Sequence, residues 1–457
     1  MKRLSDSSIL RVTACVLAAL LFATAAFNGA YAQELSRIDR GRGLSMLKNV
    51  KNKLKKDYYD ATFGGMDIDA RFATAEEKVR EAKTLSEMFG AIAQAVMDLN
   101  DSHTRFSPPL RSAIIDYGIE MQIVGDNCFV VNIADDSDAK KKGVAIGDRI
   151  VKINGFTVTR SELWKMIYYY YTLNPQLKLS LSMIKPDGTA KDIIIDADVT
   201  HLKQVVDLTS SIDFNEAQRE GARRSGLNKH IFRDVGGITI WKMPSFTFEP
   251  NEVSRFVNQF KDKSAVIIDL RGNPGGYVVT LEKLVGYFFE QDLKIADLKG
   301  RKELDPMEAK SKKDDVFKGK VIVLIDAGSA SAAEIFSRLM QLEHRGVVLG
   351  DISSGKVMMS RSFSLDAGSG TLVSYGGSIT EADVIMSDGQ SLEHVGVTPH
   401  VRILPTGEDL ANRRDPVLAA ALELLGHKMS PLDAGKLFDP EPYFRRKSNI
   451  AVNVTYF

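Results

Sequence analysis

The sequence has little cysteine and almost no net charge, and each shortage excludes a class of protein. Only Cys15 and Cys128 occur among the 457 residues, which excludes a scaffold rich in disulfides. Lysine and arginine together number 60, aspartate and glutamate 59, and the formal net charge is +1. That balance leaves no basic surface expected to bind nucleic acid or an anionic membrane. The composition, 44% hydrophobic and 26% charged, is that of a soluble globular protein with a large core.

A hydrophobic run near the N-terminus has the pattern of a targeting signal. Basic residues precede the apolar run 12–27, and Ala-Tyr-Ala at 30–32 ends it in small-x-small form. This pattern predicts a secretory signal peptide over 1–32 and an exported protein, periplasmic or extracellular. A retained anchor, which would keep the protein near the membrane, is the alternative, although the run is shorter than the roughly 20 residues of a spanning helix. Cleavage would leave Cys128 alone, which we expect in a buried strand.

Periodicity and composition divide the remaining chain into regions of different secondary structure. Helix formers dominate the first region, in which the lysine-rich run 48–56 is expected to be a solvated helix face. Two successive strand–helix–strand crossovers in the last large region predict one largely parallel sheet. The overall class is therefore multidomain α/β (α+β). The expected domains are a helical domain (35–110), a β domain (111–202), a connector (203–232), an α/β core (233–425) and a tail (426–457). Within them, the charged stretch 302–318 is expected to be a loop, and the tail from Ser430 is expected to be irregular.

The β domain carries a run that resembles a PDZ domain. Residues 147–155 combine a Gly-Asp turn, an alternating strand and an Asn-Gly hairpin turn. In a PDZ domain a peptide adds as a strand, and backbone N–H groups hold its terminal carboxylate. Tyr117, Gly118 and Ile119 stand where that carboxylate-binding loop should be, without the usual Gly-Leu-Gly-Phe form, and are our candidate peptide-binding residues. The run 164–171, with four tyrosines, is expected to be a helix that packs on the sheet.

In the core, two turns join a buried strand to a helix. The first is glycine-rich, at 271–276, and such a turn brings backbone N–H groups close to a ligand. The second follows the strand 321–325 and contains Ser329 and Ser331 ahead of the helix 332–342. A serine there is exposed beside N–H groups that suit an oxyanion, so either could be a nucleophile. The alternative is that the serine only caps the helix.

Residues 350–356 imitate a phosphate-binding P-loop but do not complete one. The next residue, Val357, lacks the hydroxyl that would bind Mg²⁺, and the run 357–365 is typical of a strand instead of a helix. We therefore expect no nucleotide. Lys356 is better interpreted as a general base for a serine, because burial lowers the pKa of an amine.

Three motifs together resemble the C-terminal processing (tail-specific) serine protease family, which is related to the tricorn core proteases. They are the runs 269–276, 329–335 and 392–399, in the family's order and after a PDZ-like domain, and the resemblance covers about residues 40–425. It implies a crotonase-like protease core that hydrolyses protein or peptide substrates, in unfolded or C-terminal segments, through an acyl-enzyme and without metal or other cofactor. Ser331 would be the nucleophile and Lys356 its base, with the N–H groups of Ala332 and of Gly275 or Gly276 as the oxyanion hole.

The chain departs from that pattern in ways that leave alternatives open. Ser360 stands where the family commonly has a glutamine that assists the lysine. The tricorn-like branch uses a Ser-His pair, which Ser102 and His103 match, and a later glutamate, for which Glu393 is the candidate. The base is therefore Lys356 or His103. A catalytically inactive, PDZ-dependent peptide-binding protein and a crotonase-like acyl enzyme are the other functions considered, and an oligomer is compatible with the sequence.

Overall fold

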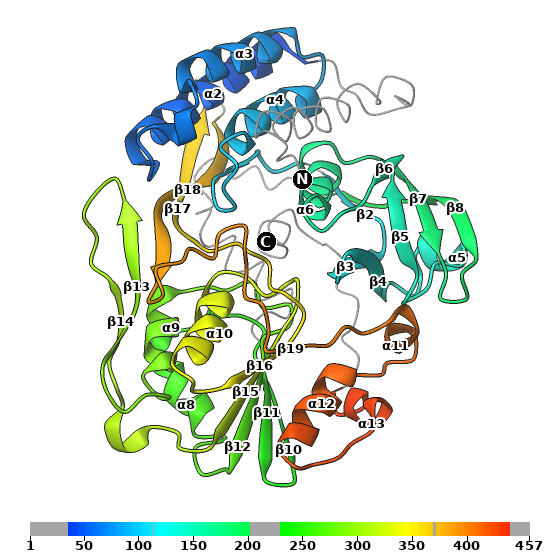
Figure 1. Cartoon of the computed structure of the whole chain (residues 1–457). Helices are drawn as coiled ribbons and strands as arrows, with labels where there is room; N and C mark the ends of the chain where they lie inside the picture. The colour runs from blue at the N-terminus through cyan, green and yellow to red at the C-terminus, as the bar shows by residue number, and fades with distance from the viewer. Residues whose placement is uncertain (1–34, 112, 202–228, 369–371, 439–457) are drawn as a thin grey trace, which may run out of the picture.

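The computed structural model describes residues 35–111, 113–201, 229–368 and 372–438, and every structural statement below concerns these ranges. The predicted signal peptide, most of the predicted connector and the end of the tail lie outside them. Figure 1 shows the N-terminal helices at the top, a β domain to one side and an α/β core below. None of the described helices is long and apolar enough to cross a membrane.

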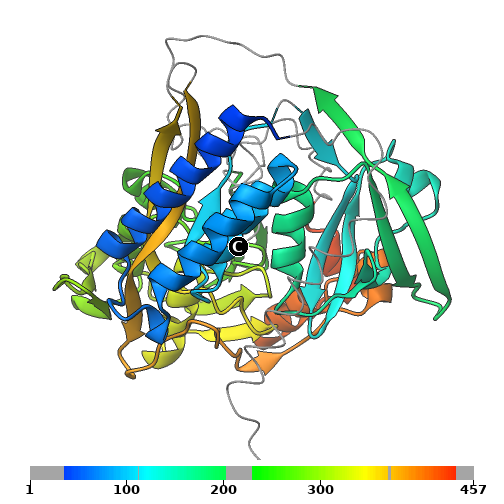
Figure 2. The ribbon, with the colours of Figure 1, turned by 90° about the horizontal axis from the view of Figure 1, so that it is seen from above.

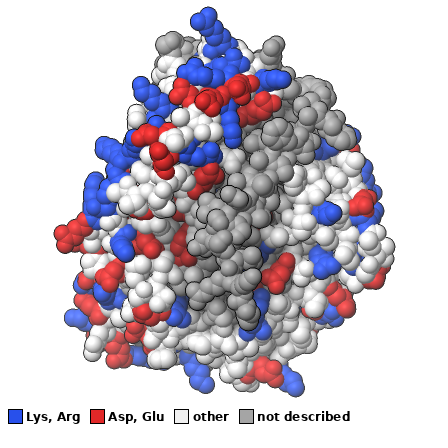
Figure 3. All heavy atoms as spheres, turned by 45° about the horizontal axis from the view of Figure 1, so that its top comes forward, with Lys and Arg blue, Asp and Glu red and all other residues white. Residues whose placement is uncertain are grey.

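The N-terminal region is mainly helical, as predicted, and its described residues form three α-helices. Each begins at a residue whose side chain accepts a hydrogen bond from the first turn. The lysine-rich face is solvated: Lys51 and Lys55 both pair with Asp69 of the next helix, and Figure 3 shows basic and acidic side chains mixed over the top of the molecule. The helices are α2 (Arg37–Asp57), α3 (Ile68–Glu81) and α4 (Leu85–Met97).

The β domain is an antiparallel sheet in the order β3-β4-β5-β7-β8, with β6 beside β5 and a separate pair, β2 and β9. Asn154 and Gly155 both have positive φ (49° and 85°), as the predicted Asn-Gly hairpin requires. Tyr168 to Tyr171 are all buried, in α6 and the π-helical turn after it. The elements are β2 (Ala113–Asp116), β3 (Ile119–Val124), β4 (Asn127–Ile133), α5 (Asp138–Lys141), β5 (Arg149–Ile153), β6 (Phe156–Thr157), α6 (Leu163–Tyr168), β7 (Lys178–Ile184), β8 (Ala190–Asp196) and β9 (Asp198–His201).

The core is a sheet in the order β10-β11-β12-β15-β16-β19, parallel except for β10, which confirms the predicted parallel sheet. Alternate residues of the central strands pack against α8, α9 and α10 on one face and against α12 on the other. The elements are β10 (Ile231–Val235), β11 (Ile238–Lys242), α8 (Val253–Val257), β12 (Ala265–Asp269), α9 (Val278–Val285), β15 (Lys320–Ile325), α10 (Ala332–Leu342), β16 (Val347–Gly350), β19 (Val401–Arg402), α11 (Gly407–Ala411) and α12 (Pro416–Leu424).

A second sheet, in the order β1-β18-β13-β14 with β17 beside β18, joins the N-terminal region to the core. Its first strand comes from the region predicted to be helical, and Arg105 pairs with Ser378. Figure 2 shows α2 lying over β17 and β18, where Asn49 donates to the Tyr375 hydroxyl at 3.0 Å. The strands are β1 (Arg105–Ser107), β13 (Leu293–Gly300), β14 (Met307–Ala309), β17 (Met358–Ala367) and β18 (Val373–Met386).

Two expectations about secondary structure were wrong. The charged stretch 302–318, expected to be a loop, contains β14, because Met307 and Ala309 are buried within it. The tail from Ser430, expected to be irregular, contains α13 (Pro431–Gly435), which Ser430 caps and whose Ala434 is buried. The start of β10 at Ile231 lies inside the predicted connector, because this strand pairs with β11.

Candidate active site

The two serines between β15 and α10 differ in environment. Ser329 is fully buried; its hydroxyl donates to the Leu270 carbonyl at 2.8 Å and accepts from the Asp326 N–H at 2.9 Å. Ser331 is partly exposed and lies at the N-cap of α10 with φ 55° and ψ −120°. A positive φ is costly for a serine and is often found at functional sites. Of the pair, Ser331 has the surroundings of a nucleophile and Ser329 those of a structural residue.

The glycine-rich turn after β12 lies directly against Ser331. A Cβ added to Gly275, whose φ is +91°, would lie 2.7 Å from the Cβ of Ser331, so only glycine allows this approach. The Gly275 N–H donates to the buried Asn273 side-chain oxygen at 2.8 Å. Among the described residues, the N–H groups of Gly276 and Ala332 have no hydrogen-bond acceptor. Those two groups, rather than the N–H of Gly275, are therefore available to a ligand.

Lys356 lies beside the nucleophile turn. The Ser331 N–H donates to the Lys356 carbonyl at 2.9 Å. The Lys356 ammonium lies 5.2 Å from the ring centroid of Trp164, which belongs to α6 of the β domain. Burial and the nearby Arg105 guanidinium lower the pKa of Lys356 to about 8. β17 begins at Met358, immediately after this loop, so a strand follows where a P-loop requires a helix.

His103 belongs to a chain of polar contacts that starts at Glu393. The Glu393 carboxylate accepts from the Ser102 hydroxyl at 2.8 Å and from the Ser102 N–H at 2.7 Å. The same hydroxyl lies 2.7 Å from His103 Nδ1. Because the hydroxyl proton goes to Glu393, its oxygen can only accept from Nδ1–H, which leaves the lone pair of a neutral imidazole on Nε2. Burial, together with Arg105, lowers the pKa of His103 to about 4.

The His103 turn is fastened to the core by side chains. Asp101 Oδ1 accepts from the His103 N–H at 2.9 Å and from the Thr380 hydroxyl of β18 at 2.7 Å. The Thr104 hydroxyl in turn accepts from the Thr380 N–H at 3.0 Å. Glu393 also accepts from the Val357 N–H at 2.9 Å, the residue after Lys356. Ser331, Lys356, Glu393 and His103 therefore belong to one connected set of contacts.

The three candidate peptide-binding residues lie apart from this set, in the β domain. Tyr117 is fully buried and its hydroxyl donates to the Gln176 carbonyl at 2.9 Å. The Gly118 N–H donates to Asp116 of the chain itself at 2.9 Å, and Ile119 begins β3, the edge strand. Their role in binding peptide stays a prediction.

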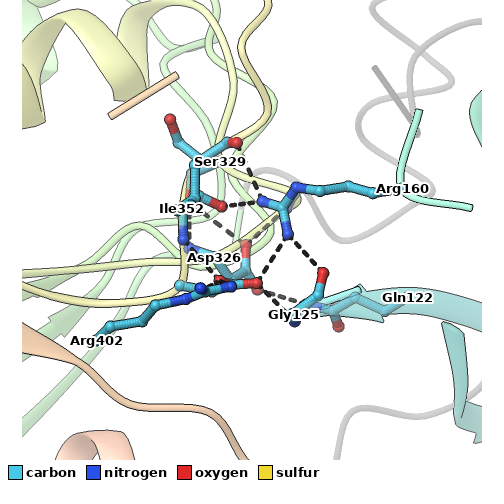
Figure 4. A network of polar contacts seen from close by, with 10 residues as sticks. Gln122, Gly125, Arg160, Asp326, Ser329, Ile352 and Arg402 are labelled. Carbon is cyan, nitrogen blue, oxygen red and sulfur yellow. Dashed lines mark hydrogen bonds and ion pairs between the residues drawn. The ribbon is translucent and has the colours of Figure 1, made fainter. Parts of the chain in front are cut away.

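Polar contacts between the β domain and the core were missed from the sequence. Arg160 donates to Asp351 at 2.9 Å and to the carbonyls of Ile352 and Ser353 in the Lys356 loop. Figure 4 shows Arg160 pointing toward Ile352 and Gly125. Asp351 is 3% exposed and also pairs with Arg402. No local pattern marks Arg160, because its partners lie almost two hundred residues away.

A second residue missed from the sequence is Glu334, which is fully buried in α10. Its spacing from Ser331 is that of a capping box, a signal that could have identified it. Burial raises the pKa of Glu334 to about 7. Nowhere in the described ranges do three or more His, Cys, Asp or Glu side chains gather as a metal site would require.

Comparison with known proteins identifies the class. Residues 234–403 match the model of peptidase family S41, and residues 116–199 match that of the PDZ domain. The core of the chain therefore resembles the serine peptidases of family S41 and its β domain resembles a PDZ domain, which confirms the predicted resemblance and fold class.

The names of similar proteins agree with the match to peptidase family S41. A "Probable CtpA-like serine protease" of Staphylococcus epidermidis is 25% identical over 379 residues, which cover 79% of this chain and 65% of the relative. One of Staphylococcus aureus is 23% identical over 418 residues, covering 88% and 73%. The chain thus spans just under two thirds of the length of the first relative. The solved structure of mature CPAF has a TM-score of 0.60 at 14% identity, covering 81% of this chain and 94% of CPAF, and shows a shared fold.

Proposed function

We propose that the protein is an exported serine endopeptidase of the C-terminal processing type, which cleaves unfolded or C-terminal protein segments through an acyl-enzyme on Ser331. The observation that carries the proposal is the chain from Glu393 through Ser102 to His103, connected through Val357 to the loop beside Ser331. A nucleophile with a base that a third group orients is the arrangement of covalent hydrolases. The sequence pattern of residues 1–32 supports export.

In the proposed reaction the Ser331 hydroxyl attacks the scissile carbonyl carbon and its proton passes to His103 Nε2. The N–H groups of Ala332 and Gly276 stabilise the oxyanion of the tetrahedral intermediate. His103 returns the proton to the leaving amine as the carbon–nitrogen bond breaks. Water then attacks the acyl-enzyme as His103 accepts its proton. His103 returns that proton to the Ser331 oxygen as the ester bond breaks, which releases the new carboxyl terminus and restores the free enzyme.

Lys356 is a second candidate for the base, because burial lowers its pKa to about 8. At pH 7 most of a lysine with that pKa is still protonated, whereas His103, with a pKa of about 4, is almost wholly neutral. This difference favours His103 as base. Lys356 would then contribute a positive charge beside the nucleophile.

The substrate class follows from the PDZ domain and the family. β3 lies at the edge of its sheet, so a peptide could add to it as a further strand. α6, on the same domain, brings Trp164 to Lys356. A segment bound by this domain would therefore lie close to Ser331.

The test is Ser331→Ala, assayed by degradation of casein. Loss of the nucleophile should lower turnover at least about 10³-fold, and a fluorophosphonate should label the wild type but not the variant. Ser430→Ala, the same change at the cap of α13, should leave turnover unchanged. Equal turnover by Ser331→Ala and the wild type would contradict the proposal. A wild type that binds peptides but never cleaves them would support the inactive, PDZ-dependent alternative.

A further inference from the structure

Glu334 makes more contacts than a helix cap needs. Its carboxylate accepts four hydrogen bonds: from the Ser353 hydroxyl at 2.5 Å, the Gly355 N–H at 2.7 Å, the Lys356 N–H at 2.9 Å and the Ser331 N–H at 3.0 Å. A capping box requires only the last of these. The other three all come from the loop that ends in Lys356.

This carboxylate is also costly to bury, which makes a purely local role a poor explanation. Glu334 is 0% exposed, and a buried carboxylate is tolerated only when donors replace its lost water. Two oxygens offer about four lone-pair sites, and all are used. A helix end of ordinary function would cap equally well with an exposed carboxylate, as α4 does: its Glu87 is exposed and accepts from the Lys83 N–H at 2.7 Å.

The loop that donates to Glu334 also contacts Glu393, the residue that orients the proposed base His103. The N–H groups of Gly355 and Lys356 donate to Glu334, and the next N–H, of Val357, donates to Glu393 at 2.9 Å. Two acidic side chains therefore hold consecutive residues of one loop. One belongs to the helix of the nucleophile, and the other orients the Ser102–His103 pair.

We infer that Glu334 is a positioning residue for the proposed reaction: its carboxylate fixes the Ser331 backbone and the Lys356 loop relative to one another. The inference rests on the proposed function, since it takes Ser331 as the nucleophile. Glu334 touches no reacting atom and acts through the backbone that it holds. Its loss should therefore slow the chemical step and leave substrate binding unchanged.

The test compares Glu334→Gln with Glu87→Gln, the same change at the exposed cap of α4, in the full-length protein. A glutamine amide turns one acceptor into a donor that faces N–H groups, so kcat and the rate of fluorophosphonate labelling should both fall about 10²-fold with KM unchanged. Glu87→Gln should stay within about twofold of the wild type in all three. A folded Glu334→Gln with wild-type kcat would overturn the inference.

A second variant keeps the test decisive if Glu334→Gln does not fold. Glu334→Asp retains the carboxylate but withdraws it by one methylene, so kcat should fall about tenfold at constant KM. Wild-type kcat in that variant would equally overturn the inference. Because the proposed function fails only if Ser331→Ala remains active or the wild type is inactive, the two failures are distinguishable.

Discussion

The loop that carries Lys356 and the turn that carries His103 supply the two candidate bases by different means. Lys356 follows the nucleophile closely in the chain and is held through its own backbone: its carbonyl accepts from the Ser331 N–H, and its N–H donates to the Glu334 carboxylate. His103 comes from the N-terminal region, and side chains hold it, with Glu393 as its partner through Ser102. The difference teaches that proximity in sequence identifies a candidate base, whereas an orienting partner distinguishes one that is ready to accept a proton.

Replacing each base is the strongest way to test this comparison. His103→Ala should lower kcat by about 10²–10⁴, the usual contribution of a general base. Lys356→Met, which keeps the length of the side chain beside Trp164, should lower kcat only about tenfold, because it removes a charge and no proton acceptor. Both are measured as steady-state peptide cleavage. The opposite order of the two losses would make Lys356 the base.

The pH dependence of kcat/KM sharpens the same comparison without mutation. A base works only when unprotonated, so a His103 pKa of about 4 predicts a rate that is level through neutral pH and falls only as the pH approaches 4. With Lys356 as base, the rate would rise about tenfold per pH unit until it levels near pH 8, the value to which burial lowers that pKa. Initial rates on a fluorogenic peptide, with stability checked at each pH, separate the two profiles.

Arg160→Ala should have the smallest effect on activity, because the Lys356 loop keeps its three bonds to Glu334. The variant removes one of the two arginines that pair with buried Asp351, leaving Arg402 and backbone N–H groups, and should lower the free energy of unfolding by about 1–3 kcal/mol. The measurement is chemical unfolding, with kcat expected within about threefold of the wild type. Arg149→Ala, which removes an exposed bond to Asn127 in the same domain, is the control and should be close to neutral. A large loss of kcat at wild-type stability would instead make Arg160 part of the catalytic arrangement.

Local patterns predicted much of the fold and one half of the site. The strand, turn and helix around Ser331 follow from apolar spacing and small residues, and the structure places β15 and α10 there. The glycine-rich turn was also predictable. Which of its N–H groups is available to an oxyanion was not, because the Asn273 side chain accepts the hydrogen bond of the Gly275 N–H. The spacing of apolar residues along the chain does not indicate which hydrogen bond a side chain such as that of Asn273 will accept.

The other half of the site depends on contacts between distant parts of the chain. Ser102 and Glu393 are 291 residues apart, so only the resemblance to a family connected them in the sequence. For the contact between Arg160 and Asp351, neither a local sequence pattern nor the resemblance to a family gave a signal. The buried Met307 and Ala309 of β14 lie in a charged stretch whose composition indicated a loop, because burial there depends on pairing with β13.

The pairing of β1 with β18 has a consequence for the order in which the chain is made. Residues 101–107 leave the ribosome long before their partners, because Thr380 follows Asp101 by 279 residues and Glu393 follows Ser102 by 291. Until β18 emerges, the His103 turn has no strand to pair with and no Glu393 to orient it. A growing chain would therefore carry the proposed nucleophile turn without an assembled base. The topology would therefore delay the proposed proteolytic activity until β18 and Glu393 have been made and have folded onto the His103 turn.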